Sequence, residues 1–266
     1  MSFRTFLFVL VFPTLLSAAQ PNLLLITIDT LRADHLGCYG NATIKTPTLD
    51  SIAQKSLFFE NAICAAPLTL PSHTSLMTGR YPIHHGTRDN AGRVRDQEQT
   101  LAEILKAKGY HTYAFVSGFP LEHRFGLNQG FDIYNDAFQR TEGRPLDFGS
   151  ERNAEAVVNA FLKVAKERPY FAWIHFYDPH APYLNGGYNG EIEFVDKQLA
   201  LLIAKINLND TIVAVAGDHG EGLGEHKEWT HRIFLYDTTM HVPFFIAGPG
   251  ITAQKVAAQV RLIDFL

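Results

Sequence analysis

Apolar runs of strand length alternate with helical segments along this chain, and no other feature restricts its fold as much. The strand-like runs are residues 22–28, 57–63, 110–116, 170–176, 211–216 and 242–247. Helical segments are expected at residues 48–55, 100–108, 151–167 and about 191–206, whereas residues 119–149 are expected to be irregular. Apolar strands that alternate with helices are typical of a parallel sheet buried on both faces. We therefore predict an α/β fold with a mostly parallel sheet.

The N-terminus has the features of a secretory signal. Residues 1–19 begin with a positive charge, continue with an apolar run over residues 6–16, and end in Ser17-Ala18-Ala19, which suits a cleavage site. The run is short for a membrane span, although an uncleaved anchor is the alternative. We therefore expect a periplasmic or secreted domain of residues 20–266, with no stable membrane span after cleavage. The formal net charge of −4 argues against binding of a nucleic-acid polymer.

Polar residues directly follow three of the predicted strands. They are Asp29, the pair Asp178 and His180, and the pair Asp218 and His219. Because parallel strands place their carboxyl ends at one edge of a sheet, these side chains should converge there. Asp29, Asp218 and His219 would then hold one divalent cation, and two carboxylates with an imidazole suit Zn²⁺ or Mn²⁺ better than Ca²⁺. The plainer alternative is that the aspartates only cap turns.

The stretch of residues 67–80 indicates a short helix that ends at Gly79. Pro71 suits a first helical position, so Thr69 is expected just before the helix, where free N–H groups favour an anion. As a further ligand of the same cation, the Thr69 hydroxyl would be activated to attack a bound phosphate or sulfate ester. A threonine before a helix more often serves only as a cap.

Three further residues are candidates for the opposite side of the substrate. His180 and His231 would neutralise ester oxygens or protonate the leaving group, and Asn90 would donate to an equatorial oxygen. Alternatively, the two histidines join Asp178 to hold a second metal. Surface roles for all of these loop residues remain the simpler interpretation.

Several motifs together resemble the sulfatase-like branch of the alkaline phosphatase superfamily. Residues 22–29 are similar to that family's first metal strand, and residues 217–226 are similar to its second metal segment. Residues 69–80 resemble the sulfatase nucleophile signature, Cys/Ser-x-Pro-Ser-Arg followed by Thr-Gly-Arg. The resemblance covers nearly all of residues 20–266. It implies an alkaline-phosphatase-like three-layer α/β/α sandwich and a metal-dependent ester hydrolase.

The resemblance also assigns roles. Asp29, Asp218 and His219 match metal-ligand positions, Thr69 matches the nucleophile, and His180 matches a substrate-contacting histidine. Asn90, 90 − 69 = 21 residues after Thr69, is similar to the oxyanion-contacting asparagine of phosphodiesterase relatives. Because family members usually continue past residue 266, we expect a catalytic domain that lacks a C-terminal subdomain.

The departures from the family pattern are informative. True sulfatases convert Cys or Ser at the nucleophile position to formylglycine, and Thr69 cannot be converted in that way. His73 replaces an arginine, His231 replaces a lysine, Thr30 replaces a second carboxylate, and residues 118–121 lack the Lys and His of the Gly-Lys-x-His segment. A plain threonine nucleophile resembles phosphodiesterases and phosphoethanolamine transferases of the superfamily.

From these observations we expect a metal-dependent hydrolase that cleaves phosphate esters, diesters or sulfate esters through Thr69. Its substrate would be a small molecule or a glycan or lipid ester. The alternatives are a transferase that passes a phosphoryl-linked head group to a glycan or lipid, and a non-catalytic binding protein with the same fold.

Overall fold

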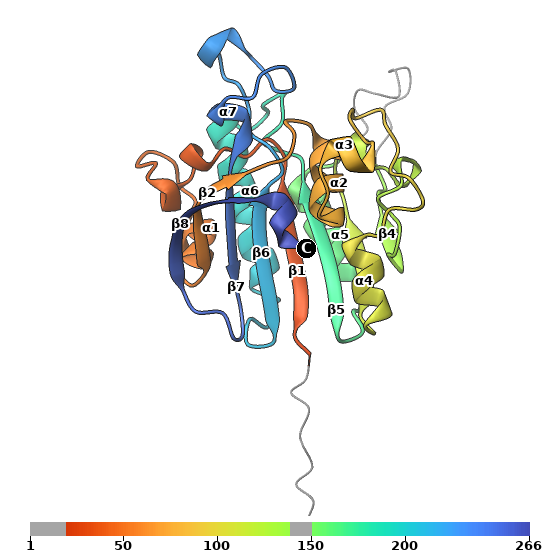
Figure 1. The fold of residues 1–266 in the computed structure, drawn as a ribbon. Helices are drawn as coiled ribbons and strands as arrows, with labels where there is room; N and C mark the ends of the chain where they lie inside the picture. The colour runs from red at the N-terminus through yellow and green to blue at the C-terminus, as the bar shows by residue number, and fades with distance from the viewer. Residues whose placement is uncertain (1–19, 139–150) are drawn as a thin grey trace, which may run out of the picture.

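A computed structural model describes residues 20–138 and 151–266, and these form one mixed sheet covered by helices on both faces (Figure 1). Its strands are β1 (Asn22–Ile28), β2 (Leu57–Ile63), β3 (His111–Phe115), β4 (Ile133–Asn135), β5 (Tyr170–Phe176), β6 (Thr211–Gly217), β7 (His241–Ala247) and β8 (Gln254–Arg261). They lie in the order β4-β3-β5-β1-β6-β7-β2-β8. The run from β4 to β6 is parallel, β7 is antiparallel to both neighbours, and β2 pairs with β8 in parallel. The prediction of an α/β fold with a mostly parallel sheet is confirmed.

Helices form a layer on each face of the sheet. On one face lie α1 (Pro47–Ala53), α5 (Ala154–Lys163) and α6 (Tyr188–Ile203), and on the other lie α2 (Thr69–Thr78) and α4 (Leu101–Ala107). Two short helices, α3 (Pro82–His85) and α7 (Asp237–Met240), lie in connections. The three-layer sandwich expected from the family resemblance is therefore present.

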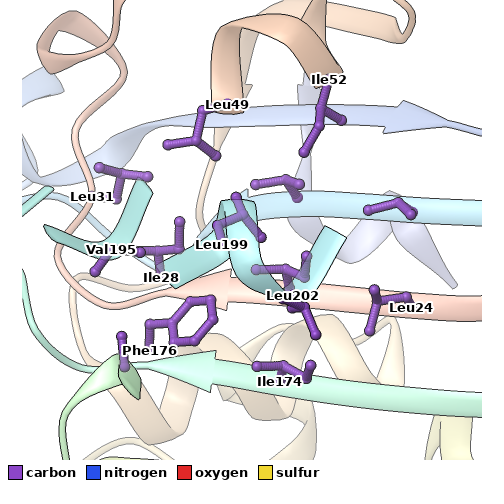
Figure 2. Packing of buried hydrophobic residues seen from close by; sticks show 14 of the residues in the cluster. Leu24, Ile28, Leu31, Leu49, Ile52, Ile174, Phe176, Val195, Leu199 and Leu202 are labelled. Carbon is purple, nitrogen blue, oxygen red and sulfur yellow. The ribbon is translucent and has the colours of Figure 1, made fainter. Parts of the chain in front are cut away.

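An apolar core lies between the sheet and α6, on the face that α1, α5 and α6 cover. Figure 2 shows side chains of β1, β5 and α6 packed together there: Leu24, Ile28, Ile174, Phe176, Val195, Leu199 and Leu202. Neighbouring side chains on a strand point to opposite faces, so every second residue of β1 enters this core. The intervening residues of β1 face α2, and this second face carries the candidate site.

The strands predicted from the sequence form within one residue of their expected limits, but two strands were missed. β4 has three residues and lies within the segment expected to be irregular, and β8 follows the strand expected to be last. Both lie at edges of the sheet. An edge strand is partly exposed, so it lacks the apolar pattern by which buried strands are recognised. β8 is largely exposed along its length.

Three helices also begin earlier than expected. α1 begins at Pro47 rather than at Thr48, α2 at Thr69 rather than at Pro71, and α6 at Tyr188 rather than near residue 191. The predicted signal segment, residues 1–19, lies outside the described residues. Among the helices that the structure does describe, none has the length and apolar character that crossing a bilayer requires.

Candidate active site

The alternation of side chains along β1 positions the first candidate ligand. Leu24, Ile26 and Ile28 face α6, whereas Leu25 and Thr27 face α2. Asp29 continues this second set one residue beyond the strand, at the carboxyl edge of the sheet. It is fully buried, so its carboxylate needs compensation from nearby groups or from a cation.

The predicted convergence of Asp29, Asp218 and His219 is confirmed. Each offers a ligand atom, and these atoms all lie within 4.8 Å of one another. His219 Nε2 lies 3.8 Å from Asp29 Oδ1 and 3.6 Å from Asp218 Oδ2. Asp218 and His219 directly follow β6, which is hydrogen-bonded to β1 in parallel, so the two strands end side by side. The strand order therefore brings together residues about 190 positions apart in the sequence, as parallel α/β sheets commonly do.

The hydrogen bonds of this cluster do not satisfy all of its carboxylate oxygens. Asp218 Oδ1 accepts from the backbone N–H groups of Thr30, at 3.1 Å, and His219, at 2.7 Å. Asp218 Oδ2 and Asp29 Oδ1 are buried and have no hydrogen-bond partner within residues 20–138 and 151–266. His219 Nδ1 lies 3.0 Å from the Gly220 carbonyl, which can only accept, so Nε2 presents its lone pair to the carboxylates. Two unpartnered carboxylate oxygens and a nitrogen lone pair are a donor set that fits a divalent cation.

The pKa values of these groups follow from burial and crowding. Burial opposes ionisation of Asp29, yet the neighbouring imidazoles of His175 and His219 hold its pKa below the usual range. Burial raises the pKa of Asp218 well above its usual value, and the charge of Asp29 raises it further. Burial, with the nearby His231, lowers the pKa of His219 to about 3, so this imidazole is neutral, as a metal ligand must be.

Thr69 is the first residue of α2, and its side chain joins the same cluster. Its hydroxyl donates to Asp29 Oδ2 over 3.4 Å and lies 3.4 Å from His219 Nε2. The expectation that Thr69 precedes the helix was wrong: Leu68, in extended conformation, is the cap residue, and Pro71 occupies the third helical position. Pro71 is tolerated there because the first N–H groups of a helix have no intrahelical acceptor. The helix ends at Gly79 in left-handed conformation, with φ of 63°, as predicted.

Thr69 lines a cavity of about 770 Å³ that also receives the three other predicted catalytic residues, Asn90, His180 and His231. Asn90 Oδ1 accepts from the N–H of Leu70 in the first turn of α2, at 2.9 Å. Its NH₂ group is therefore the donor that remains for a ligand. Asn90 comes from the loop after α3, so only tertiary structure brings it beside Thr69.

The two histidines of this cavity are held by different partners. His180 Nδ1 lies 2.9 Å from the Tyr177 hydroxyl and 2.6 Å from the Ala181 carbonyl, and its ring stacks on Tyr177. His231 Nδ1 lies 3.1 Å from Glu221 Oε1, and its ring centroid is 4.4 Å from that of His219. The rings of His180 and His231 are 5.3 Å apart. Both rings are therefore near the proposed ligands while also lining the cavity.

The second metal considered for Asp178, His180 and His231 is not supported. Across residues 20–138 and 151–266, Asp29, Asp218 and His219 are the one group of three such ligands brought together. Burial raises the pKa of the Asp178 carboxyl to about 7, and its Oδ2 is buried with no hydrogen-bond partner among the described residues.

Several residues of the site were not singled out from the sequence. Tyr177 and Glu221 orient the two cavity histidines, and Phe119, Arg124 and Arg232 form part of the cavity wall. Beneath the cluster lie Thr27, Trp173 and His175, which are fully buried on the α2 face of the sheet. In the sequence these residues resemble ordinary strand positions, so only their polarity within apolar runs could have drawn attention to them.

Comparison with known proteins places this site in a family. A model of the family described as Sulfatase matches residues 21–266. The chain belongs to the sulfatase family. It is 29% identical to the ulvan-active sulfatase of Formosa agariphila over 93% of its own length and 60% of that protein. It is 22% identical to the iduronate 2-sulfatase of Homo sapiens over 92% of its own length and 62% of that protein. The chain thus spans about three fifths of these sulfatase relatives.

Solved structures agree with the family assignment at the level of the fold. The phosphonate monoester hydrolase of Agrobacterium radiobacter matches with a TM-score of 0.76 and 19% identity, over 92% of this chain and 72% of that one. A protein of the alkaline phosphatase superfamily from Vibrio parahaemolyticus matches with a TM-score of 0.71 and 22% identity, over 93% of this chain and 64% of that one. The alkaline-phosphatase-like fold expected for this sulfatase-family chain is therefore confirmed.

Proposed function

We propose that this sulfatase-family chain is a metal-dependent hydrolase of sulfate esters or phosphate esters and diesters, with Thr69 as its nucleophile. The observation that carries the proposal is the position of the Thr69 hydroxyl. It lies 3.4 Å from both Asp29 Oδ2 and His219 Nε2 and at the same time lines the cavity that contains Asn90, His180 and His231. A hydroxyl that only capped a helix would need none of these neighbours.

The residues fit a divalent cation held by Asp29, Asp218 and His219, with the Thr69 oxygen beside them. When bound, such an ion would lower the pKa of the hydroxyl and neutralise charge on the ester. We favour Zn²⁺ or Mn²⁺, because the set includes an imidazole nitrogen, whereas Ca²⁺ takes oxygen ligands.

The chain's own groups account for both halves of the reaction. In the first half, Thr69 Oγ1, already deprotonated, forms a bond to sulfur or phosphorus while the bond to the alcohol oxygen breaks. His180 or His231, in its protonated form, gives a proton to the departing alcohol. In the second half, water attacks the Thr69 ester, the same imidazole takes the water proton, and Thr69 is released as it began. The NH₂ group of Asn90 donates to a non-bridging oxygen throughout.

The relatives favour anionic esters without deciding between sulfur and phosphorus. An ulvan-active sulfatase and an iduronate 2-sulfatase point to a sulfate ester, for example on a glycan, whereas a phosphonate monoester hydrolase shares the fold. An unmodified threonine supports phosphoryl transfer, because it cannot become formylglycine. The same Thr69 ester would also allow transfer to an alcohol instead of to water, which is the second candidate activity.

The deciding experiment compares Thr69→Val, which keeps the shape of the side chain, with Thr69→Ser, which keeps its hydroxyl. Turnover is measured with aryl sulfate, phosphomonoester, phosphodiester and phosphonate substrates in Mn²⁺ and Zn²⁺, with the bound metal determined in parallel. Thr69→Val should lose at least about a thousandfold in kcat on the best substrate. It should still bind metal, and Thr69→Ser should keep measurable turnover.

Equal turnover by the parent and Thr69→Val would refute the nucleophile assignment. Adding glycerol or another alcohol tests the transferase alternative, since a transferase would form the alcohol ester at the expense of the hydrolysis product. Metal binding without turnover of any substrate would support the non-catalytic binding protein instead.

We also propose export of this protein, on the signal features of residues 1–19. Full-length protein should be found in the periplasm or medium and should be processed near residue 20. Deletion of residues 2–19 should retain it in the cytoplasm, which cell fractionation and N-terminal sequencing would check.

A further inference from the structure

A fully buried polar cluster lies directly beneath the proposed metal ligands, in the core between the sheet and α2. Its members are Thr27 of β1, His73 of α2, and Trp173 and His175 of β5. None of them lines the cavity or has a role in the proposed chemistry. Burying four polar side chains in an apolar core is costly unless they form hydrogen bonds with one another. Their mutual hydrogen bonds therefore indicate the role of the cluster.

The Thr27 hydroxyl is the centre of this cluster. Its Oγ1 lies 2.9 Å from Trp173 Nε1, 2.9 Å from His73 Nε2 and 3.2 Å from His175 Nδ1. The register of β1 and β5 places Thr27 beside His175, and Trp173 lies two residues earlier on the same face. One hydroxyl on β1 therefore joins two imidazoles and an indole that come from α2 and β5.

The chemistry of the donors restricts how these groups are arranged. The indole N–H can only donate, so Thr27 accepts from Trp173. The hydroxyl carries one hydrogen, and it goes to His73 Nε2, because His73 Nδ1 faces the Thr69 carbonyl and must be the protonated nitrogen. Thr27 therefore accepts from His175 Nδ1. The orientation of each imidazole is therefore linked to that of its partner through Thr27, and neither ring can rotate without breaking a buried hydrogen bond.

The far nitrogens of the two imidazoles reach the proposed metal ligands. His73 Nδ1 donates to the Thr69 carbonyl over 2.8 Å and lies 3.5 Å from Asp218 Oδ2. His73 follows Thr69 by one helical turn, so both project from the same side of α2. His175 Nε2 lies 3.5 Å from Asp29 Oδ2, the oxygen that also accepts from Thr69, but this nitrogen has no hydrogen-bond partner among the described residues. The cluster thus touches both carboxylates and the backbone of the proposed nucleophile.

We infer that Thr27 is a positioning residue for the metal centre: through its hydrogen bond to His73 it holds the first turn of α2 and the imidazole beside Asp218 in one arrangement, and through His175 it fixes the ring that packs beside Asp29. This inference rests on the proposed function, since it assigns a task to residues around the same site. Hydrogen-bonding groups behind metal ligands fix ligand orientation, and losing one typically costs about 10- to 100-fold in metal affinity or activity.

The test compares Thr27→Val, which is nearly isosteric but has no hydroxyl, with Thr27→Ser, which keeps the hydroxyl. Binding of Mn²⁺ to metal-free protein is measured by titration calorimetry, and kcat and KM are determined separately on the best substrate. Thr27→Val should weaken Mn²⁺ binding by about 10- to 100-fold and lower kcat more than it changes KM. Thr27→Ser should restore affinity to within about threefold of the parent, because it keeps the same hydrogen bonds.

Ser75→Ala provides a matched control on the same helix. Ser75 is buried and its hydroxyl joins His85 Nε2 and the Pro71 carbonyl, each at 2.9 Å, without contact to the proposed ligands. Its loss should lower the melting temperature but leave Mn²⁺ affinity unchanged. This control separates a general cost of removing a buried hydroxyl from a specific effect on the metal centre.

Unchanged Mn²⁺ affinity in Thr27→Val, with the parent binding normally, would overturn the inference and leave the proposed function intact. A parent that binds no divalent cation would overturn both. Should Thr27→Val fail to fold, His73→Phe keeps a ring of similar size and removes both nitrogens that link Thr27 to the Thr69 carbonyl. It should weaken Mn²⁺ binding by a similar factor, and normal affinity in that variant would likewise overturn the inference.

Discussion

The floor and the rim of this site are built in opposite ways. On the floor, Asp29, His73, His175 and His219 are fully buried and come from strand ends and the first turns of α2. On the rim, Asn90, His180 and Arg232 come from loops and remain partly open to solvent. The floor is therefore suited to hold an ion in one fixed geometry, whereas the rim is suited to admit and release a substrate.

The charged groups of the two regions also differ: those on the floor are buried, and those on the rim are exposed and paired. On the floor, two buried carboxylates lie close together, and each keeps one oxygen that no group in the described part of the chain hydrogen-bonds. On the rim, charges are paired and screened, as in the pair of Arg232 with Asp89 at 3.5 Å, where both side chains are more than half exposed. Changes to the floor should therefore alter metal binding, and changes to the rim should alter turnover with the metal still bound.

The largest effect is expected from removing a floor carboxylate. Asp218→Asn keeps the shape of the side chain but removes the negative charge that faces His219 and His73. The affinity for Mn²⁺, measured by titration calorimetry, should fall at least about a hundredfold. Elemental analysis should find little metal in the purified variant, and turnover should be lost with it. Full activity in this variant would show that the buried floor does not hold the ion.

A smaller effect, of a different kind, is expected on the rim. His180→Gln and His231→Gln should each retain metal, and the residue that protonates the leaving group should lose about 10²- to 10⁴-fold in kcat. The loss should be large for esters of phenol and small for esters of p-nitrophenol, whose oxygen needs little help from an acid. Equal losses on both esters would assign that histidine to oxyanion binding instead.

The smallest effect concerns stability and lies outside the metal cluster. Burial raises the pKa of Asp178 to about 7, above that of an unfolded aspartate, so the folded state binds its proton more tightly. This contribution to stability is present at low pH and is lost as the pH rises through about 7. Between pH 5 and pH 8 the parent should therefore lose about 2–3 kcal/mol relative to Asp178→Asn, as measured by urea unfolding of the metal-free proteins.

A constant stability difference between the two proteins across that pH range would show that Asp178 has an ordinary pKa. Asp178→Asn should in any case keep its metal and its turnover, because Asp178 does not belong to the group of three ligands that the described residues bring together. Loss of metal from this variant would revive the second-site hypothesis and extend the floor beyond Asp29, Asp218 and His219.

Much of the site was predictable because its residues follow buried strands. Asp29, Asp218 and His219 each come directly after an apolar run, and a parallel sheet must bring such positions to one edge. Thr69 was recognisable by its place at the start of a helix and by its family motif. What the sequence could not show was where that helix begins, because Pro71 is compatible with several positions in a first turn.

The supporting residues were harder to predict, for a definite physical reason. Tyr177, Glu221 and Arg232 matter through contacts across loops, and loop paths are not encoded by periodicity. His175 and Thr27 lie within apolar strands, where a polar residue has no preferred partner until a neighbouring strand sets the register. The strands β4 and β8 were missed for a related reason: edge positions require little apolar patterning.

By itself the sequence determined the layers of the fold and the ends of the strands that carry the proposed ligands. The spacing of apolar residues and the polar residues that follow each strand are local properties of the sequence. Only the tertiary structure decided that Asn90 reaches the first turn of α2 and that Thr27 joins His73 to His175. Those contacts join residues through strand register and helix packing, and these depend on the whole folded core rather than on any one segment.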